Sequence, residues 1–534
     1  MTKLFKEHRI FFIILLVGIF LRSYKPLAWF AYQHDQDVAS WIIKDILVNK
    51  HLRLIGQETN SQGVFIGPIF YYLQIPFYLL TNMDPKGTIL LPILISVFSI
   101  FSFYFVFTKM FGKKVGVIAS LIYAVSAQVV FTEREVAPTM PLMLWSVWYF
   151  YTVYLLYEAP RAYARGFFSA QLHSKSCSAD FKKLSSLGSR PRFSAFADKG
   201  KSKAYIFLGF LLGLIWNINF SLATLFLVAI MAQIFSRKKF ELKNLALGVL
   251  VLIITLSPFI VFEFKHDFIQ TKAIASSLTT DKDYIEGTSK GFAKLDRVIQ
   301  IVHKNTTRLF LGNYYFLPVS WAFYILIILF GVCWQKKLAE KKLLIIMVFW
   351  QLIYLVFFTI NPINISEYYL YGMNVIWIAI VSLTTSHFLS RKMLFKLVVS
   401  GAAIFTGLHL YSNFKYSSNR AGYLERYAIV KFINEDAKTH NYPCVSVSYI
   451  TSPGYEFGYR YLFWLEGMHV NRPISGSPVY SIVFPHNKVN RLDKFFGALG
   501  LVLPDYGKYT SNEVLVSCSG ENSNLTDPMF GYTE

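Results

Sequence analysis

The sequence has few charged residues, few cysteines and none of the short motifs that mark nucleotide-driven or zinc-dependent proteins. Charged side chains make up 16% of the 534 residues, against about 25% in a soluble globular chain. Four cysteines without a Cys-x-x-Cys pair are too few for a disulfide scaffold, an iron–sulfur protein or a zinc protein. Neither GxxxxGKS/T nor HExxH occurs, so the chain has no visible machinery for ATP-driven transport.

Hydrophobic residues, in contrast, are abundant. They form 54% of the chain, aromatics form 18%, and the mean hydropathy is +0.41. This composition excludes a cytosolic enzyme, a disordered chain and a fibrous repeat. The net charge of +22 does not indicate nucleic-acid binding, because the Lys and Arg residues cluster between apolar runs, where they orient membrane spans.

Uncharged runs long enough to cross a bilayer recur along the chain. About 20 helical residues cross the hydrocarbon core, and the candidates are 10–21, 87–108, 115–132, 136–157, 204–236, 244–262, 309–335, 343–366, 368–390 and 397–414. The run 204–236 has basic residues at both ends, so we interpret it as a hairpin that turns at 216–219. The sequence therefore predicts a mainly α bundle of about 11 spans, with the N-terminus in the cytoplasm and the C-terminus outside.

One uncharged segment does not fit this alternation. A span at 64–83 would place the basic pair Lys113–Lys114 on the wrong side. The segment contains two prolines and several tyrosines, which favour the lipid–water boundary. We expect an interfacial or re-entrant helix here, and the alternative is a twelfth span.

The chain divides into a transmembrane part, 1–414, and a small outer domain, 415–534. The first outer loop, 23–86, is predicted to contain the interfacial helices, and the Ser-, Lys- and Arg-rich stretch 158–203 is predicted to be a disordered cytoplasmic insertion. We expect 263–308 to form a second large outer loop.

The outer domain is predicted to be α/β. It should hold a helix at 424–438, strands at 444–450 and 513–518, and an amphipathic stretch at 455–466. Cys444 and Cys518 can form a disulfide there if the compartment oxidises, whereas Cys177 and Cys333 should be free thiols.

Asp35 and Asp37 are the first candidate functional residues. They belong to HDQD, at the start of a stretch whose apolar residues recur with helical spacing. A carboxylate beside the lipid headgroups can act as a general base on an acceptor hydroxyl or bind a metal. The alternative is that the aspartates only cap the helix.

Three other charged groups fall on the same outer face. Arg134 and Glu135 lie between two uncharged runs, and the Arg134 guanidinium is suited to clamp a phosphate. Lys265 and His266 end a span, and Glu367 and Tyr369 begin one. Each group could instead be a span cap, solvated loop charge or part of an aromatic belt.

The ordered series of these segments resembles the GT-C glycosyltransferases, in the bacterial branch akin to the protein O-mannosyltransferases and the lipid A aminoarabinose transferase. The similar segments cover roughly 8–410 without the insertion. They are HDQD, SQGVFIGPIFYYLQIPFYLL, FTKMFGKKVGVIASLIYAVSAQVVFTEREVAPTMPLMLW, SPFIVFEFKHDF and the Tyr-rich start of the run 368–390.

The resemblance implies an inverting transfer of a sugar from a polyprenyl-phosphate donor to an unknown acceptor, which can be a protein, a lipid or a polysaccharide. It makes Asp35 the first choice for the catalytic carboxylate and Asp37 the second. It implies that Arg134 contacts the donor phosphate, in one crevice with Asp35. A family-typical lysine is replaced by Gly67, so Arg134 or Lys265 would take over its contact. A divalent metal fits the resemblance, but no metal ligand is predicted.

The resemblance also implies a multi-pass protein of the bacterial inner membrane. Two other classes of function stay open. A transporter or flippase of lipid-linked saccharide would use the outer charges to bind cargo, and would be expected to show an internal repeat, which is not evident. An adhesion or assembly protein would use the outer domain, but would leave the first loop unexplained.

Overall fold

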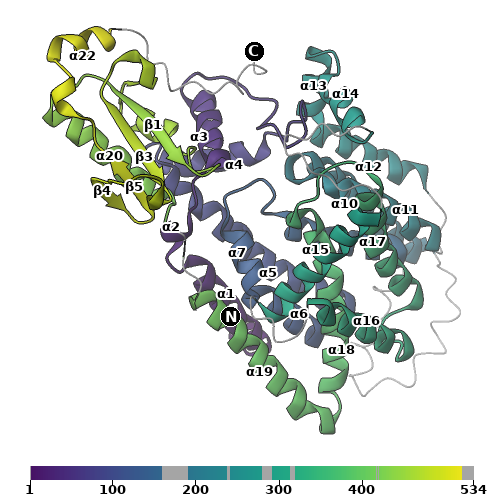
Figure 1. Ribbon diagram of the computed structural model, residues 1–534. Coiled ribbons are helices and arrows are strands. Elements are labelled where there is room, and N and C mark those ends of the chain that lie inside the picture. The colour runs from purple at the N-terminus through teal and green to yellow at the C-terminus, as the bar shows by residue number, and fades with distance from the viewer. Residues whose placement is uncertain are drawn as a thin grey trace, which may run out of the picture.

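Helices run from the N-terminus to Lys415, and a five-stranded sheet follows them (Figure 1). The structure is a computed structural model that describes residues 2–158, 191–236, 241–279, 292–312, 319–415, 418 and 420–519. The order of the elements confirms the predicted class, a mainly helical chain with a small C-terminal sheet domain.

The helical part consists of long apolar helices interrupted by short ones. Its α-helices are α1 (Thr2–Ser23), α2 (Pro26–Trp29), α3 (His34–Leu47), α4 (Ile69–Leu80), α5 (Leu90–Phe111), α6 (Lys113–Val125), α7 (Ala127–Arg134), α8 (Leu142–Glu158), α10 (Pro191–Ile218), α11 (Phe226–Phe235), α12 (Leu242–Thr255), α13 (Ser257–Lys265), α14 (Ile269–Ser277), α15 (Phe292–Leu311), α16 (Val319–Gln335), α17 (Lys341–Ile360), α18 (Asn374–Leu389) and α19 (Lys392–Lys415). The 3-10 helices η1 (Pro85–Ile89), η2 (Phe220–Leu225) and η3 (Glu367–Met373) connect some of them.

Fewer helices are able to span a membrane alone than the uncharged runs predict. Within the described residues, four are long and apolar enough, and six are if each of two bent pairs counts as one span. The predicted number of 11 is therefore not confirmed. The four are Pro85–Phe111, Lys341–Ile360, Glu367–Leu389 and Lys392–Lys415, and shorter apolar helices account for several of the other runs.

The two bent pairs interrupt runs that hydropathy alone treats as continuous. Helices α6 and α7 meet at 60°, and α12 and α13 meet at 59°. Ser126 leaves the helical conformation between the first pair. Pro258 lies in the first turn of α13, where its missing N–H leaves no hydrogen bond unmade. A hydropathy profile identifies apolar residues, but it does not detect a bend within an apolar run.

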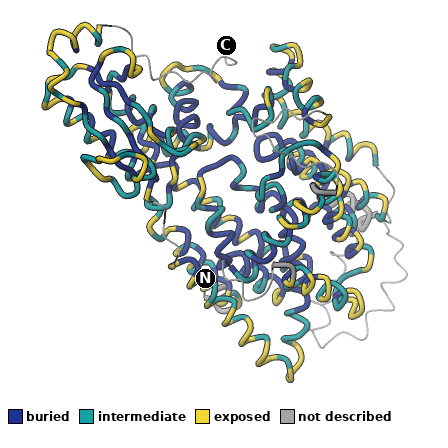
Figure 2. Tube along the Cα trace, in the orientation of Figure 1, coloured by how far each residue is buried: buried dark blue, intermediate teal, exposed yellow. Residues whose placement is uncertain are grey.

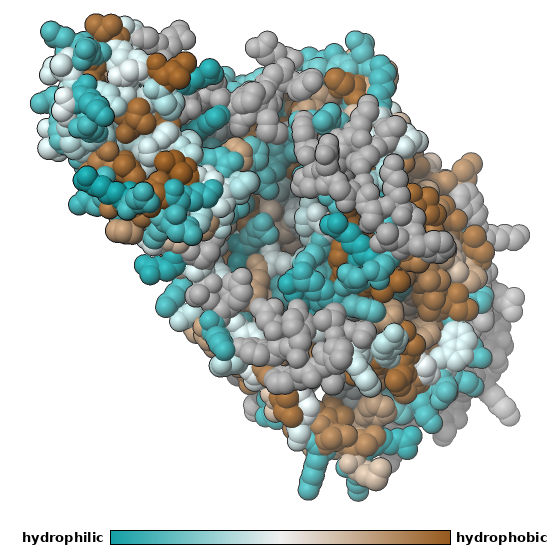
Figure 3. All heavy atoms as spheres, in the orientation of Figure 1, coloured by the Kyte–Doolittle hydropathy of each residue, from teal (hydrophilic) through white to brown (hydrophobic). Residues whose placement is uncertain are grey.

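Lipid-facing surface is evident on the outside of the bundle. Helix α19 is apolar, and its residues are mostly exposed except for three buried ones near its C-terminal end, as Figure 2 shows at the lower edge. Figure 3 shows hydrophobic residues gathered over the helical part, whereas hydrophobic and hydrophilic residues alternate over the C-terminal domain. Exposed apolar helices of this kind are expected of a chain whose solvent is lipid.

Three predictions on loops have different outcomes. The hairpin turn at 216–219 is confirmed, because α10 ends at Ile218 and Asn219 accepts a hydrogen bond from the Ser221 amide at 2.8 Å to start η2. The expected outer loop at 263–308 stays a prediction, and its described part consists mostly of two helices, α14 and the amphipathic α15. The expected disorder at 158–203 lies mostly outside the described residues, and from Pro191 onward the chain already belongs to α10.

The first outer loop carries both predicted surface helices, α3 and α4, which pack against each other. The 12 residues of α4 extend only about 18 Å, which is too short for a hydrocarbon core of about 30 Å. This length favours the interfacial helix over a twelfth span.

The C-terminal domain is built on a mixed sheet in the order β2-β1-β3-β5-β4. Strand β1 pairs in parallel with β2 and β3, and β5 pairs in antiparallel fashion with β3 and β4. The elements are α20 (Tyr423–Thr439), β1 (Val445–Thr451), α21 (Arg460–Leu465), β2 (Val470–Asn471), η4 (Pro473–Ser475), β3 (Val479–Phe484), η5 (His486–Lys488), β4 (Lys494–Phe496), β5 (Leu499–Val502), η6 (Tyr506–Lys508) and α22 (Ser511–Ser517). The predicted helix at 424–438 and strand at 444–450 are confirmed.

The predicted strand at 513–518 is wrong, because this segment forms α22. The Thr510 hydroxyl accepts a hydrogen bond from the Glu513 amide, and the Glu513 carboxylate accepts one from the Thr510 amide. This reciprocal cap satisfies two helix-terminal N–H groups, and it outweighs the β propensity of the valines that follow.

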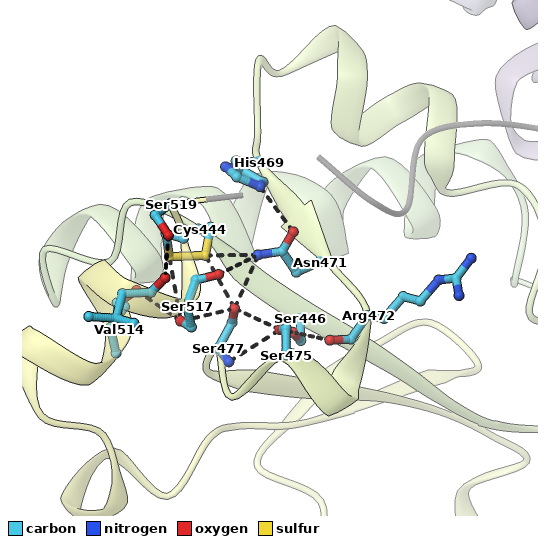
Figure 4. Close-up of a disulfide and its surroundings, with 12 residues drawn as sticks. Cys444, Ser446, His469, Asn471, Arg472, Ser475, Ser477, Val514, Ser517 and Ser519 are labelled. Atoms are coloured by element: carbon cyan, nitrogen blue, oxygen red, sulfur yellow. Dashed lines mark hydrogen bonds between the residues drawn. A yellow bond between two sulfur atoms is a disulfide. The ribbon is translucent and has the colours of Figure 1, made fainter. Parts of the chain in front are cut away.

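A disulfide fastens α22 to the sheet, as the sequence allowed. Cys444, which precedes β1, is bonded to Cys518 at the end of α22 (Figure 4). Beside it, the Asn471 amide donates to the Ser517 carbonyl at 3.1 Å. Cys333 is a buried free thiol, as expected, and Cys177 lies outside the described residues.

A buried ion pair joins α1 to α7 inside the helical part. Arg22 is 1% exposed and Glu133 is 3% exposed, and their closest charged atoms are 2.5 Å apart. The same guanidinium donates to the Ala124 carbonyl at 2.8 Å, and the Tyr123 hydroxyl donates to Glu133. The pair fixes the end of α7, and therefore the residues that follow it.

Replacing Arg22 with alanine should strongly destabilise the chain. The Glu133 charge would be left buried without its partner, which typically costs about 3–5 kcal/mol. Thermal unfolding in detergent measures the loss, and Arg391→Ala, at an exposed position, is the matched control. Equal melting temperatures for the two variants would contradict this role of the pair.

Candidate active site

A cavity of about 820 Å³ lies where the first outer loop meets the helical bundle. Its walls come from the start of α3, the segments 57–66 and 132–143, η2 and the start of α11, α14, the end of α17, and η3. Asp35, Glu135, Glu367 and Tyr369 all line it. Four of the residues singled out from the sequence, from three distant segments, therefore meet in one cavity.

Asp35 lies in the first turn of α3, and its side chain opens into the cavity. The helix begins through a reciprocal cap of its own, in which the Gln33 amide donates to the Gln36 side chain at 2.9 Å. The aspartates are therefore not needed as caps. Burial raises the pKa of Asp35, while His34 and a hydrogen bond from Gln57 lower it to a smaller extent. A carboxylate with a raised pKa is a stronger base when ionised.

Gln36 connects the start of α3 to the segment after α7. Its side-chain amide donates to the Val136 carbonyl at 3.0 Å, next to Glu135. Glu135 opens into the same cavity as Asp35, and its pKa is raised by burial first and by the negative charge of Asp35 second. The two carboxylates thus share one electrostatic environment, and Tyr368 lines the cavity near both of them.

Glu367 and Tyr369 reach the cavity from η3. Glu367 is bound by two cations of α15, because Lys304 forms an ion pair with it and the Arg308 guanidinium lies 2.6 Å from its other oxygen. The Asn305 amide also donates to the Glu367 carbonyl at 2.9 Å. Glu367 is therefore held in place as one half of a charge network, and Tyr369 stacks on Phe358.

A second cavity of about 360 Å³ adjoins the first, and Arg134 lines this one. Thr132, Glu135 and Tyr371 line both cavities, and Arg308 lines the smaller one. The expectation that Arg134 and Asp35 share one crevice is thus corrected: they line neighbouring cavities with Glu135 in the common wall. Arg134 is the last residue of α7, and its side chain faces the smaller cavity and not the larger one.

The Arg134 guanidinium has unused hydrogen-bonding capacity. One terminal nitrogen donates to the Leu21 carbonyl, and the group lies 4.8 Å above the ring centre of Trp29. Its Nε and Nη1 atoms are buried, and neither has a hydrogen-bond partner within the part of the chain that the structure describes. An anion in the smaller cavity would supply the missing acceptors.

Three other candidates from the sequence lie outside the walls of both cavities. Asp37 is 6% exposed and faces the C-terminal domain instead. Lys265 is exposed at the end of α13. The Nδ1 atom of His266 lies 2.8 Å from the Phe262 carbonyl. The long span that was expected to carry Lys265 and His266 to the site is bent by 59°.

The charge of the larger cavity was not predicted. Among the described residues that line it, the acidic ones are Asp35, Glu58, Glu133, Glu135 and Glu367, and there is no Lys, Arg or His. Glu58 and Gln57 were missed because nothing in the surrounding loop marks them, and Arg308 was missed because it lies far from the acidic groups in sequence. Only the helical periodicity of α15 offered a hint of Arg308.

Within the described ranges, no group of three or more His, Cys, Asp or Glu side chains is arranged to hold a metal ion. Asp35 and Glu135 are the two carboxylates that could contribute to one. Because a divalent ion such as Mg²⁺ or Ca²⁺ takes six or more ligands, two carboxylates alone do not define its site.

The surroundings of Gly67 leave no space for the lysine that the resemblance implies at this position. Its amide donates to the Trp216 carbonyl at 3.0 Å, and a Cβ atom here would lie only 2.0 Å from the Asn217 side-chain oxygen. A larger residue would have to displace Asn217. Position 67 therefore has no room for the lysine that the resemblance implies.

Comparison with known proteins supports the family suggested by the sequence. A family model described as dolichyl-phosphate-mannose-protein mannosyltransferase matches residues 66–170. The crystal structure of ArnT from Cupriavidus metallidurans bound to undecaprenyl phosphate is similar with a TM-score of 0.56 and 11% identity, over 95% of this chain and 99% of that one. The chain therefore has the fold of this ArnT structure.

Further comparisons give the same GT-C fold or a weaker likeness. The apo structure of the same ArnT is similar with a TM-score of 0.53 and 11% identity, over 94% of this chain and 98% of that one. The oligosaccharyltransferase of Archaeoglobus fulgidus reaches a TM-score of 0.46 at 12% identity, over 90% and 69%. No curated protein sequence matches the chain significantly. The GT-C resemblance inferred from the ordered segments is confirmed.

Proposed function

We propose that the chain is an inverting glycosyltransferase that moves a sugar from a polyprenyl-phosphate donor to an acceptor hydroxyl on the outer face of the membrane. The observation that carries the proposal is the pair of adjoining cavities. One is acidic and holds Asp35, and the other holds the unsatisfied guanidinium of Arg134. A base for the acceptor and a cation for the leaving phosphate are thus separated by a single wall.

In the proposed reaction, the acceptor oxygen attacks the anomeric carbon from the side of Asp35. The bond from that carbon to the phosphate oxygen breaks, and its electron pair leaves with the lipid phosphate. Asp35 takes the hydroxyl proton, for which its raised pKa is suited. Attack opposite to the leaving group inverts the anomeric centre. Glu135 and Tyr368 would border the sugar between the two cavities.

The leaving phosphate would be bound in the smaller cavity. Arg134 would donate through Nε and Nη1 as negative charge develops, which is the kind of interaction that lowers the barrier when it is made in place before the reaction. Arg308 lines the same cavity and would contribute a second cation. Lys265 is not placed to take part.

The prenyl chain needs an apolar path to the lipid. Phe226 and Leu227 line the larger cavity, yet they are 48% and 45% exposed. Ile230 and Ile234, at 42% and 72% exposure, continue from Phe226 along one face of α11. This face would guide the tail from the bilayer through the larger cavity to the wall shared with the smaller one, where the phosphate would be bound.

The proposed location is a bacterial inner membrane, with the N-terminus in the cytoplasm and the C-terminal domain outside. The basic clusters of the sequence support this orientation through the positive-inside rule. The acidic lining of the larger cavity disfavours an anionic group close to Asp35.

Asp35→Asn should lower sugar transfer by about 100-fold or more, because positioned proton transfer contributes about 10²–10⁴-fold. Transfer from a polyprenyl-phosphate sugar in isolated membranes measures this. The matched control is Asp267→Asn, at an exposed position outside both cavities, which should behave like the parent chain. Full activity of the Asp35 variant would remove it from the proposed role.

Glu135→Gln should shift the acidic limb of the pH profile of kcat/KM to lower pH. Asp35 acts as a base only when ionised, so activity is lost as the pH falls through its raised pKa. The negative charges of Asp35 and Glu135 disfavour each other's ionisation. Removing the charge of Glu135 therefore lowers the pKa of Asp35. An unshifted limb, or a shift to higher pH, would contradict the electrostatic coupling.

Arg134→Gln should raise the KM for the lipid donor or lower kcat, with a combined loss in kcat/KM of about 10-fold to 100-fold, as expected for a hydrogen bond to a charged group. Lys265→Gln is the matched control, because Lys265 is exposed and outside both cavities. If the Lys265 variant loses more activity than the Arg134 variant, the phosphate lies elsewhere.

A further inference from the structure

Asp37 contacts the C-terminal domain, although it lies only two residues after Asp35. Two residues along a helix correspond to about 200° of rotation, so the two side chains point to opposite sides of α3. The Oδ1 atom of Asp37 accepts a hydrogen bond from the backbone amide of Tyr461 at 3.2 Å. That amide belongs to the first turn of α21, where helices leave N–H groups unsatisfied. Asp37 thus joins the start of α3 to the start of α21.

Several neighbouring contacts reinforce this junction. The Tyr32 hydroxyl lies 3.4 Å from the same Oδ1 atom. The rings of Trp41 and Tyr461 meet edge to face at 5.6 Å, and the rings of His34 and Phe457 are 4.7 Å apart. The residues on the α3 side of these contacts all lie within two turns of Asp35.

The backbones approach closely at the same place. Gly458 has a φ of +86°, and a Cβ atom on it would lie 2.4 Å from the Tyr32 carbonyl oxygen. The Tyr423 amide donates to the Phe30 carbonyl at 2.9 Å. The backbone of the domain is therefore in close contact with the segment immediately before α3.

The opposite end of the first outer loop is held by the same domain. The Tyr423 hydroxyl donates to Asp84 at 2.5 Å, and the Tyr461 hydroxyl donates to the Met83 carbonyl at 2.8 Å. Two tyrosines thus contact both the segment that enters α3 and the segment that follows α4. The first outer loop can shift only if these contacts with the domain are lost.

We infer that the C-terminal domain sets the position of Asp35, and that Asp37 is the positioning residue through which it acts. The inference rests on the proposed function, in which Asp35 is the catalytic base. Misplacement of a reacting group by about 1 Å can cost about 10²-fold in rate. Asp37 itself touches neither cavity, so its effect on the reaction passes through α3.

Two variants of Asp37 separate positioning from chemistry. Asp37→Ala removes the acceptor for the Tyr461 amide and should lower kcat by about 10-fold to 100-fold, while the donor KM stays within about threefold because both cavities keep their linings. Asp37→Asn keeps an acceptor oxygen of the same shape without the charge, so it should recover most of the kcat. Asp35→Asn is measured beside them.

Phe457→Ala tests the same idea from the side of the domain. Phe457 is 41% exposed, so its loss does not empty a core, and it should lower kcat in the same direction as Asp37→Ala. Phe495→Ala, on β4 and 63% exposed, is the matched control and should leave kcat unchanged. If Asp37→Ala does not accumulate as folded protein, the kcat values of Phe457→Ala and Phe495→Ala test the positioning role instead.

The possible outcomes distinguish this inference from the proposed function. Full activity of Asp35→Asn overturns the proposed function, whatever the Asp37 variants do. If Asp35→Asn is inactive but Asp37→Ala and Phe457→Ala keep the parental kcat, the positioning inference alone is overturned. If Asp37→Asn is as inactive as Asp35→Asn, the charge of Asp37 takes part in the chemistry and the positioning role is wrong.

Discussion

The buried ion pair between Arg22 and Glu133 is the constraint on which the geometry of the site depends. It fixes the end of α7 against α1 in the middle of the bundle, where an unpaired charge would be very costly. Of the next two residues, Arg134 lines the smaller cavity alone and Glu135 lies in the wall shared by both, because consecutive residues at the end of a helix point in different directions. One residue further on, the Val136 carbonyl receives the Gln36 amide and holds α3 beside them.

The separation of charge between the two cavities follows from this arrangement. Negative side chains gather around the space that Asp35 faces. Arg22 pairs with Glu133, Lys304 and Arg308 pair with Glu367, and none of these three cations lines that space. A reaction that moves negative charge from an acceptor oxygen to a leaving phosphate needs such a division, with a base at one end and cations at the other.

The C-terminal domain packs extensively against the first outer loop. Its hydrophobic core is continuous with that of the first outer loop, since Val38, Ile42 and Tyr71 belong to the same cluster as Ile429 and Val447. Hydrogen bonds to Asp37 and Asp84 add direction to this apolar contact. Loops are mobile by default, and packing the loop that bears Asp35 against a disulfide-bonded sheet domain restricts that motion.

Composition, hydropathy and short-range spacing determined the class of the protein, the surface helices α3 and α4, the hairpin at Asn219, and the choice of Asp35 and Glu135 as candidates. These features depend on neighbours in sequence, which a linear pattern records. The number of spans, the separation of Arg134 from Asp35, and the contacts of Asp37, Arg308 and Glu58 were decided only in three dimensions. The helix at 513–517 follows from a local cap between Thr510 and Glu513, which β propensity does not take into account. Bends within apolar runs, local capping and contacts between distant segments leave no mark on hydropathy, so the tertiary structure alone shows which charges meet and which are kept apart.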